Sequence, residues 1–223
     1  PIDPRVSEAV AAYWQRGAGN ASSQHRLGRR ASQTLEDARG SITRMLGASP
    51  GDRIVFTSGA TEANNLALFG LAGEAPGRVL VGATEHPSVL APAEHLRRAG
   101  FDVLRIGVDH QGRVDLEQLR QEIDDTTRLV SVMAANHETG VLQPLPEIAA
   151  ICRDRGVPLH TDAVQLVGKL PLDFRCLGVS ALSLSAHKLQ GPVGIGALLL
   201  RPETLPVPRM LGGFQQWGIR PGT

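Results

Sequence analysis

The stretch that decides the fold is ALSLSAHKLQGPVGIGALLL, residues 181–200. Its two short apolar runs, Ala181–Ser185 and Ile195–Leu200, predict two strands, and the loop between them contains glycine and proline. Because no long helix separates these strands, we expect one of them to run antiparallel. The loop carries Lys188 directly after the first strand.

The rest of the chain alternates short β-branched or apolar runs with longer segments of helical period. The expected strands are Arg53–Thr57, Arg78–Val81, Asp102–Ile106, Leu129–Met133, Val157–Thr161, Ala181–Ser185 and Ile195–Leu200. The expected helices are Leu27–Leu46, Glu62–Leu71, Ser88–Ala99, Leu116–Ile123 and Pro146–Arg155. This order predicts an α/β fold, with a mostly parallel seven-stranded sheet flanked by helices in three α/β/α layers.

The composition is that of an ordinary globular domain. Apolar residues make up 42% of the 223 residues, charged residues 20%, and the formal net charge is +1. The basic residues are scattered, so we expect no nucleic-acid partner, and no apolar run is long enough to suggest a membrane span. Two cysteines, Cys152 and Cys176, are too few for a secreted disulfide framework, which favours a reducing, cytoplasmic location. We assign no metal ligands.

Only two of the 23 basic residues are lysines, so lysine chemistry has two candidates. Lys188 follows one expected strand and Asp162 follows another. Open α/β sheets bind ligands beyond the carboxyl ends of their strands, so these two side chains are expected to converge. A lysine amine forms an imine with an aldehyde cofactor, and a carboxylate keeps a pyridine nitrogen protonated. The pair predicts a pyridoxal-phosphate (PLP) site, whereas Lys169, in a turn-like stretch, is interpreted as a surface residue.

Two further segments lie at strand ends. Ser58–Glu62 joins a strand to a helix, and its small residues suit a phosphate cradle, although Ser58 or Thr61 acting as a simple helix cap is the alternative. His86 also follows a strand and opens a helix. Its ring is a candidate to lie over a planar cofactor, and a helix cap or a core histidine is the alternative. Convergence of these strand ends favours the functional interpretation.

Seven motifs occur in order along nearly the whole chain. They are Gly19–Ser23 with His25-Arg26, FTSGATEANN at Phe56–Asn65, TEHPSV at Thr84–Val89, NHETG at Asn136–Gly140, HTDAVQLVGKLPLD at His160–Asp173, SAHKLQGPVGIGAL at Ser185–Leu198 and GGFQQWGIRPGT at Gly212–Thr223. Together they resemble the class V aminotransferase family of fold-type I PLP enzymes, and most closely its cysteine desulfurase branch, the NifS/IscS-like proteins.

The resemblance implies roles residue by residue. It makes Lys188 the catalytic Schiff-base lysine, pairs Asp162 with the pyridine nitrogen, and stacks His86, also catalytic, on the cofactor ring. Gln165 is implied to face the phenolic oxygen. The residues implied to hold the phosphate are Ala60, Thr61, Ser185 and His187. The threonine that matches Thr223 reaches the phosphate of the neighbouring subunit in this family, which implies a homodimer.

Two positions depart from the family pattern. His137 stands where the family usually has a second asparagine that contacts the PLP oxygen, and an imidazole can also donate a hydrogen bond there. Gly213-Phe214-Gln215-Gln216 replaces a third glycine followed by Gln or His and then Glu, which puts the details of this loop in doubt.

The implied function is a cysteine desulfurase, which converts L-cysteine to L-alanine and passes persulfide sulfur to an acceptor protein, as in iron–sulfur cluster assembly. A selenocysteine lyase or another class V aminotransferase is the alternative enzyme, and a scaffold or binding module is the non-enzymatic one. Residues 1–223 are expected to be the PLP-binding large domain, cut at both ends and without the C-terminal small domain. The family's persulfide-forming cysteine and substrate-carboxylate arginine belong to that missing portion, and neither Cys152 nor Cys176 matches the cysteine.

Overall fold

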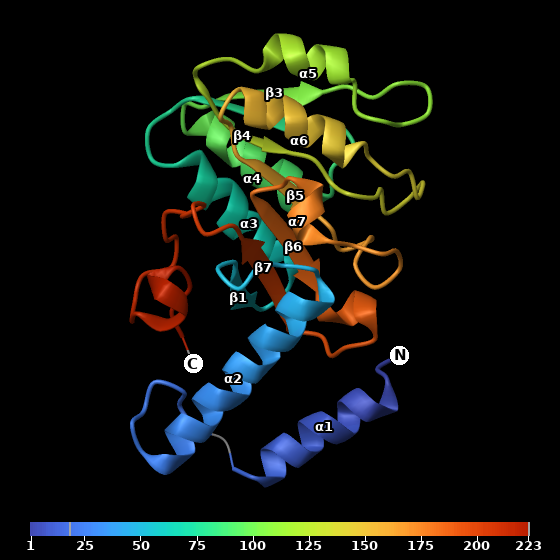
Figure 1. Ribbon diagram of the computed structural model, residues 1–223. Coiled ribbons are helices and arrows are strands. Elements are labelled where there is room, and N and C mark those ends of the chain that lie inside the picture. The colour runs from blue at the N-terminus through green and yellow to red at the C-terminus, as the bar shows by residue number, and fades with distance from the viewer. Residues whose placement is uncertain (18, 223) are drawn as a thin grey trace.

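Seven short strands form one sheet in the order β1-β7-β6-β5-β4-β2-β3 in the computed structural model, which describes residues 1–17 and 19–222 (Figure 1). The strands are β1 (Arg53–Thr57), β2 (Arg78–Gly82), β3 (Asp102–Ile106), β4 (Thr127–Ser131), β5 (Leu159–Asp162), β6 (Ala181–Ser185) and β7 (Gly196–Leu200). β7 pairs antiparallel with both β1 and β6, and the other neighbouring strands are parallel. The expected mostly parallel sheet with an antiparallel last strand is confirmed.

Helices cover both faces of this sheet. They are α1 (Pro4–Gln15), α2 (Arg26–Met45), α3 (Ala60–Ala72), α4 (Pro87–Arg98), α5 (Leu116–Glu122), α6 (Leu145–Asp154) and α7 (Phe174–Leu177), with 3-10 turns η1 (Ala186–Leu189) and η2 (Gln215–Gly218). Successive side chains of β2 point to opposite faces of the sheet and into two hydrophobic cores. Val79 and Val81 pack with α3 and α4 on one face, and Leu80 packs with α5 and α6 on the other. The predicted three layers are therefore confirmed, and α1 and α2 extend away from the sheet (Figure 1).

The structure differs from the sequence-based expectation in several element bounds, and the short helix α7 was not expected. Helix α1 was not expected, although Asp3 caps it through the Arg5 backbone N–H and Pro4 occupies its first turn. β4 begins two residues earlier than expected, at Thr127. β5 begins two residues later, after Pro158, which has no N–H to donate to a ladder.

The parallel strands β2, β4, β5 and β6 direct their carboxyl ends to one edge of the sheet. The segments that leave these ends carry the functional candidates of the sequence, and the N-terminus of α3 opens at the same edge. Within residues 1–17 and 19–222, no helix combines the length and the apolar character needed to cross a bilayer.

Candidate active site

A cavity of about 520 Å³ lies at this edge of the sheet. The predicted site residues that line it are Ala60, Thr61, His86, His137, Asp162, Gln165, Ser185, His187 and Lys188. They come from α3, from η1, from the last residues of β5 and β6, and from the segments that follow β2, β4 and β5. The structure thus brings together every predicted site residue that it describes, and Thr223 lies outside the described residues.

Lys188 sits on the tight turn η1 at the rim of this cavity. The Gly191 N–H donates to the Ala186 carbonyl (2.8 Å), and the Ala186 N–H donates to the Ile195 carbonyl (3.0 Å). Only glycine fits at position 191, since a Cβ there would lie 2.9 Å from the Ala186 oxygen. This closed loop orients Lys188, whose side chain is exposed as expected for a reactive amine open to a ligand.

The N-terminus of α3 also lines the cavity. Its first N–H groups have no acceptor inside the helix, and they form the positive end of the helix dipole. Gly59 is the N-cap and no side chain caps it, so capping by Ser58 or Thr61 is not what the structure shows. Close approach of β7 to this turn requires Gly196, where a Cβ would lie 2.5 Å from the Gly59 carbonyl carbon. The turn is available to an anion such as a phosphate.

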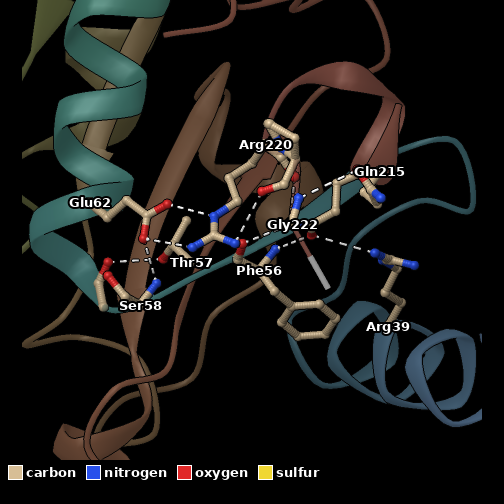
Figure 2. A network of polar contacts seen from close by, with 11 residues as sticks. Arg39, Phe56, Thr57, Ser58, Glu62, Gln215, Arg220 and Gly222 are labelled. Atoms are coloured by element: carbon tan, nitrogen blue, oxygen red, sulfur yellow. Dashed lines mark hydrogen bonds and ion pairs between the residues drawn. The ribbon is translucent and has the colours of Figure 1, made fainter. Parts of the chain in front are cut away.

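A half-buried ion pair between Glu62 and Arg220 lies beside this turn, as Figure 2 shows. Glu62 Oε2 accepts the Ser58 N–H (2.7 Å), and Glu62 Oε1 accepts from Arg220 Nε (2.7 Å). Burial raises the pKa of Glu62, but the hydrogen bonds from Arg220 and Ser58 outweigh it, and the pKa lies below its ordinary value. Arg220 therefore links the segment after η2 to the proposed phosphate turn, a contact that the sequence analysis missed.

The loop that departs from the family pattern also contacts β1, the edge strand of the sheet. Gln216 Oε1 accepts the Phe56 N–H (2.6 Å), and Gln216 Nε2 donates to the Phe56 carbonyl (2.9 Å). This side-chain amide imitates a neighbouring strand and satisfies both backbone groups of an exposed edge. Phe214, in contrast, is 95% exposed.

Asp162 and His86 are fixed by hydrogen bonds below the cavity. Asp162 is buried, and its Oδ1 and Oδ2 accept from the Val164 N–H (3.0 Å) and Asn64 Nδ2 (2.7 Å). His86 caps α4, because its Nδ1 accepts from the Ser88 N–H (3.1 Å), and Ser88 Oγ lies 2.7 Å from the same nitrogen. Since Nδ1 is an acceptor, the neutral ring carries its hydrogen on Nε2. His86 therefore both caps α4 and lines the cavity.

His137 lies beside His86 at the cavity. The two ring centroids are 5.3 Å apart with an edge-to-face angle of 74°. Buried Asn136 organises this loop, since its Oδ1 accepts the Glu138 N–H (2.9 Å) and its Nδ2 donates to the Thr84 carbonyl (3.2 Å). The departure from the usual asparagine therefore places an imidazole in the cavity wall, next to the predicted stacking histidine.

Two buried titratable residues near the site were not anticipated. Burial raises the pKa of Glu85 well above its ordinary value, despite a hydrogen bond from the Met133 N–H (2.5 Å), and the charge of Asp162 adds to this rise. Burial therefore favours the neutral form of the Glu85 carboxyl. Burial lowers the pKa of His160 to about 3. Sequence alone gives only a weak signal for either residue, because each lies within a motif whose other members carry the recognisable chemistry.

The remaining sequence candidates are exposed or inert. Lys169 is exposed, as expected, and its amine donates to Gln165 Oε1 at the cavity wall. Burial raises the pKa of the Cys152 thiol to about 12, Cys176 is exposed, and neither cysteine lines the cavity. Among the described residues no cluster of three or more His, Cys, Asp or Glu side chains is suited to a metal ion.

The donor set fits a planar, phosphorylated aldehyde cofactor. An anion-binding helix terminus, an accessible lysine and a buried carboxylate line one cavity, and an imidazole stands in its wall. The carboxylate can pair with a ring nitrogen, and the lysine can form an imine, so these residues fit such a cofactor.

Comparison with known proteins gives concordant matches. The family model for aminotransferase class-V matches residues 1–216. A mitochondrial cysteine desulfurase from Arabidopsis thaliana is 45% identical over 229 residues, covering 100% of this chain and 50% of the relative. A cysteine desulfurase IscS from Rickettsia felis is 43% identical, covering 100% of this chain and 56% of the relative.

Solved structures show the same similarity. A NifS-like protein superposes with a TM-score of 0.94 at 37% identity, covering 100% of this chain and 62% of that protein. A structure described as SspA in complex with cysteine has a TM-score of 0.95 at 36% identity, covering 100% of this chain and 65% of that protein. The chain spans about half the length of the curated relatives it matches.

Proposed function

Because the chain belongs to the class-V aminotransferase family, whose cofactor is PLP, we propose that residues 1–223 form the cofactor-binding large domain of a cysteine desulfurase. The observation that carries the proposal is that Lys188, Asp162 and the N-terminus of α3 line one cavity. The names of the curated relatives support the substrate, L-cysteine.

Within this proposal, Lys188 holds the cofactor covalently, Asp162 pairs with its ring nitrogen and His86 covers its ring. Gln165 and His137 are the donors for its phenolic oxygen. The residues that hold its phosphate are Ala60, Thr61, Ser185 and His187, where Ser185 Oγ and His187 Nδ1 are hydrogen-bonded at 2.8 Å. Bound there, PLP supplies an electron sink that weakens the bonds to the substrate α-carbon.

The chain's own groups then act on protons and charge. Asp162 is buried, accepts hydrogen bonds on both oxygens and lines the cavity, so its carboxyl group is held where it can pair with the ring nitrogen. Lys188 Nζ carries protons to and from the substrate α-carbon. The hydrogen on His86 Nε2 is available for a proton transfer, because Nδ1 already accepts from Ser88.

The overall reaction needs one enzyme thiol. That thiol attacks the sulfur of L-cysteine, an S–S bond forms while the C–S bond breaks, and the products are L-alanine and an enzyme persulfide. Cys152 is buried with a pKa of about 12 and Cys176 lies away from the cavity lining. We therefore propose that the thiol comes from outside residues 1–223, and that the persulfide sulfur passes to an acceptor protein.

The assembly and location are also proposals. A homodimer is supported by the motif that ends in Thr223, which reaches a neighbouring subunit in this family. A reducing, cytoplasmic compartment is supported by the two cysteines, which form no disulfide with each other.

The test uses the full-length gene product. We expect a yellow protein that borohydride bleaches, with the reduced cofactor found by mass spectrometry on the peptide containing Lys188, and release of alanine from L-cysteine. Lys188→Ala should lose the colour, whereas the matched variant Lys169→Ala should keep it. An adduct on Lys169, or turnover of selenocysteine but not of cysteine, would contradict the proposal, and a protein that binds no cofactor would favour a scaffold.

A further inference from the structure

Asn64 lies at a junction below the candidate active site. It is fully buried on α3, and its amide nitrogen donates to Asp162 Oδ2 (2.7 Å) and to Ser88 Oγ (2.8 Å). Ser88 Oγ in turn lies 2.7 Å from His86 Nδ1. One buried amide thus connects α3 to the end of β5 and to the start of α4.

The direction of these hydrogen bonds follows from the partners. An ionised carboxylate only accepts, so the Asn64 nitrogen, and not its oxygen, must face Asp162. The second hydrogen of the same amide goes to Ser88 Oγ, which leaves the Ser88 hydroxyl hydrogen free to point at His86 Nδ1. Asn64 therefore orients the donors to both Asp162 and His86.

This arrangement is not explained by satisfying Asn64 itself. The Asn64 Oδ1 atom is buried and has no hydrogen-bond partner among the described residues. An unpaired buried oxygen costs about 1–3 kcal/mol, and an alanine or leucine in the middle of a helix would avoid this cost. The amide is better explained by what it does for its two partners.

Neighbouring groups make the donor to Asp162 important. Asp162 is 8% exposed, and the nearby Glu85 is a second buried acid, whose pKa the charge of Asp162 raises, so Glu85 does not help to keep Asp162 ionised. A hydrogen bond donated to a buried carboxylate favours its charged form. The proposed function requires that charge opposite the ring nitrogen.

Resting on the proposed function, we propose that Asn64 is a positioning residue that holds Asp162 ionised and, through Ser88, fixes the ring of His86. It touches neither cofactor nor substrate in this role. Its effect is to couple the residue that pairs with the ring nitrogen to the residue that covers the ring.

The experiment uses full-length holoprotein loaded with PLP labelled with ¹⁵N at the pyridine nitrogen. In Asn64→Leu, which has the same branching of side-chain heavy atoms but no donor, the ¹⁵N signal should move from the protonated toward the unprotonated position at neutral pH. The matched control is Asn65→Leu, because Asn65 is the next residue of α3 and donates only to the Thr61 carbonyl in its own helix. Its signal should stay at the wild-type position.

Ser88→Ala tests the contact with His86 separately from the contact with Asp162. It leaves the Asn64 bond to Asp162 and should keep the pyridine signal, while the ¹⁵N signal of His86 Nδ1 changes because the hydroxyl donor is lost. A purely structural role would lower the melting temperature without moving either signal.

Asn64→Ala is measured in parallel. Alanine is the best helix former, and it disturbs the packing around position 64 in a different way from leucine, because it is smaller than asparagine. A wild-type pyridine signal in either variant overturns the proposal, as does loss of folded structure in both variants. Loss of cofactor from both with unchanged circular dichroism supports it. If wild-type protein itself carries no cofactor on Lys188 or shows an unprotonated pyridine, the proposed function fails instead.

Discussion

His160 makes a strong prediction about acid stability. It is fully buried in β5, with Nδ1 2.9 Å from Ser131 Oγ on β4 and Nε2 2.9 Å from Ser183 Oγ on β6. Burial lowers the pKa of His160 from 6.5 to about 3. The folded protein therefore excludes a proton that the unfolded chain binds below pH 6.5.

The size of the pH effect on stability follows from the difference between the pKa of His160 in the unfolded chain and in the folded protein. The contribution of His160 to stability is complete above pH 6.5 and is lost as the pH falls toward about 3. Each unit corresponds to about 1.4 kcal/mol, so the loss is about 3 kcal/mol near pH 4.5 and about 4 to 5 kcal/mol when complete. This is a large share of a typical folding free energy of about 5–15 kcal/mol.

The perturbation is His160→Gln, measured by guanidinium unfolding of the full-length protein followed by circular dichroism. The variant should be less stable than wild type near neutral pH, because a glutamine cannot replace both contacts to the serines. Between about pH 7.5 and about pH 4.5, however, it should lose about 3 kcal/mol less than wild type does. His110→Gln, which removes an exposed histidine, should follow the wild-type curve. Parallel curves for wild type and His160→Gln would refute the reasoning.

Three further predictions concern Glu85, the two cysteines and the Glu62–Arg220 ion pair. Because the pKa of Glu85 is raised above its ordinary value of 4.5, its contribution to stability is complete below that pH and is lost as the pH rises. As the pH rises above 4.5, the free energy of unfolding of Glu85→Gln should therefore increase relative to that of wild type, by up to about 1.4 kcal/mol per pH unit. A difference between the two proteins that does not change with pH would contradict this prediction. Iodoacetamide near pH 8 should label exposed Cys176 much faster than buried Cys152, as peptide mapping can measure, and equal rates would mean that Cys152 is accessible. A double-mutant cycle of Glu62→Gln and Arg220→Gln should give a coupling energy of about 1 kcal/mol in unfolding, and additive effects would show that the pair is screened by solvent.

Much of the fold could be predicted because its signals are local. The strands Arg53–Thr57, Asp102–Ile106 and Ala181–Ser185 have the expected bounds, since short apolar runs with nearby turn residues are a property of neighbouring positions. Helix α1 was missed although its cap and first-turn proline are also local. The order of the strands in the sheet was not predicted, because it depends on which apolar faces pack together.

The candidate site likewise has a part that local sequence patterns indicate and a part that only the tertiary structure shows. The sequence by itself pointed to Lys188, Asp162 and His86 as candidates at or just after strand ends, because parallel strands bring their carboxyl ends to one edge. Only the tertiary structure decided what supports them. Asn64 meets Asp162 across 98 residues, and Glu62 meets Arg220 across 158. Such contacts depend on burial and on directed hydrogen bonds between distant segments, and neither is encoded in the pattern of adjacent residues.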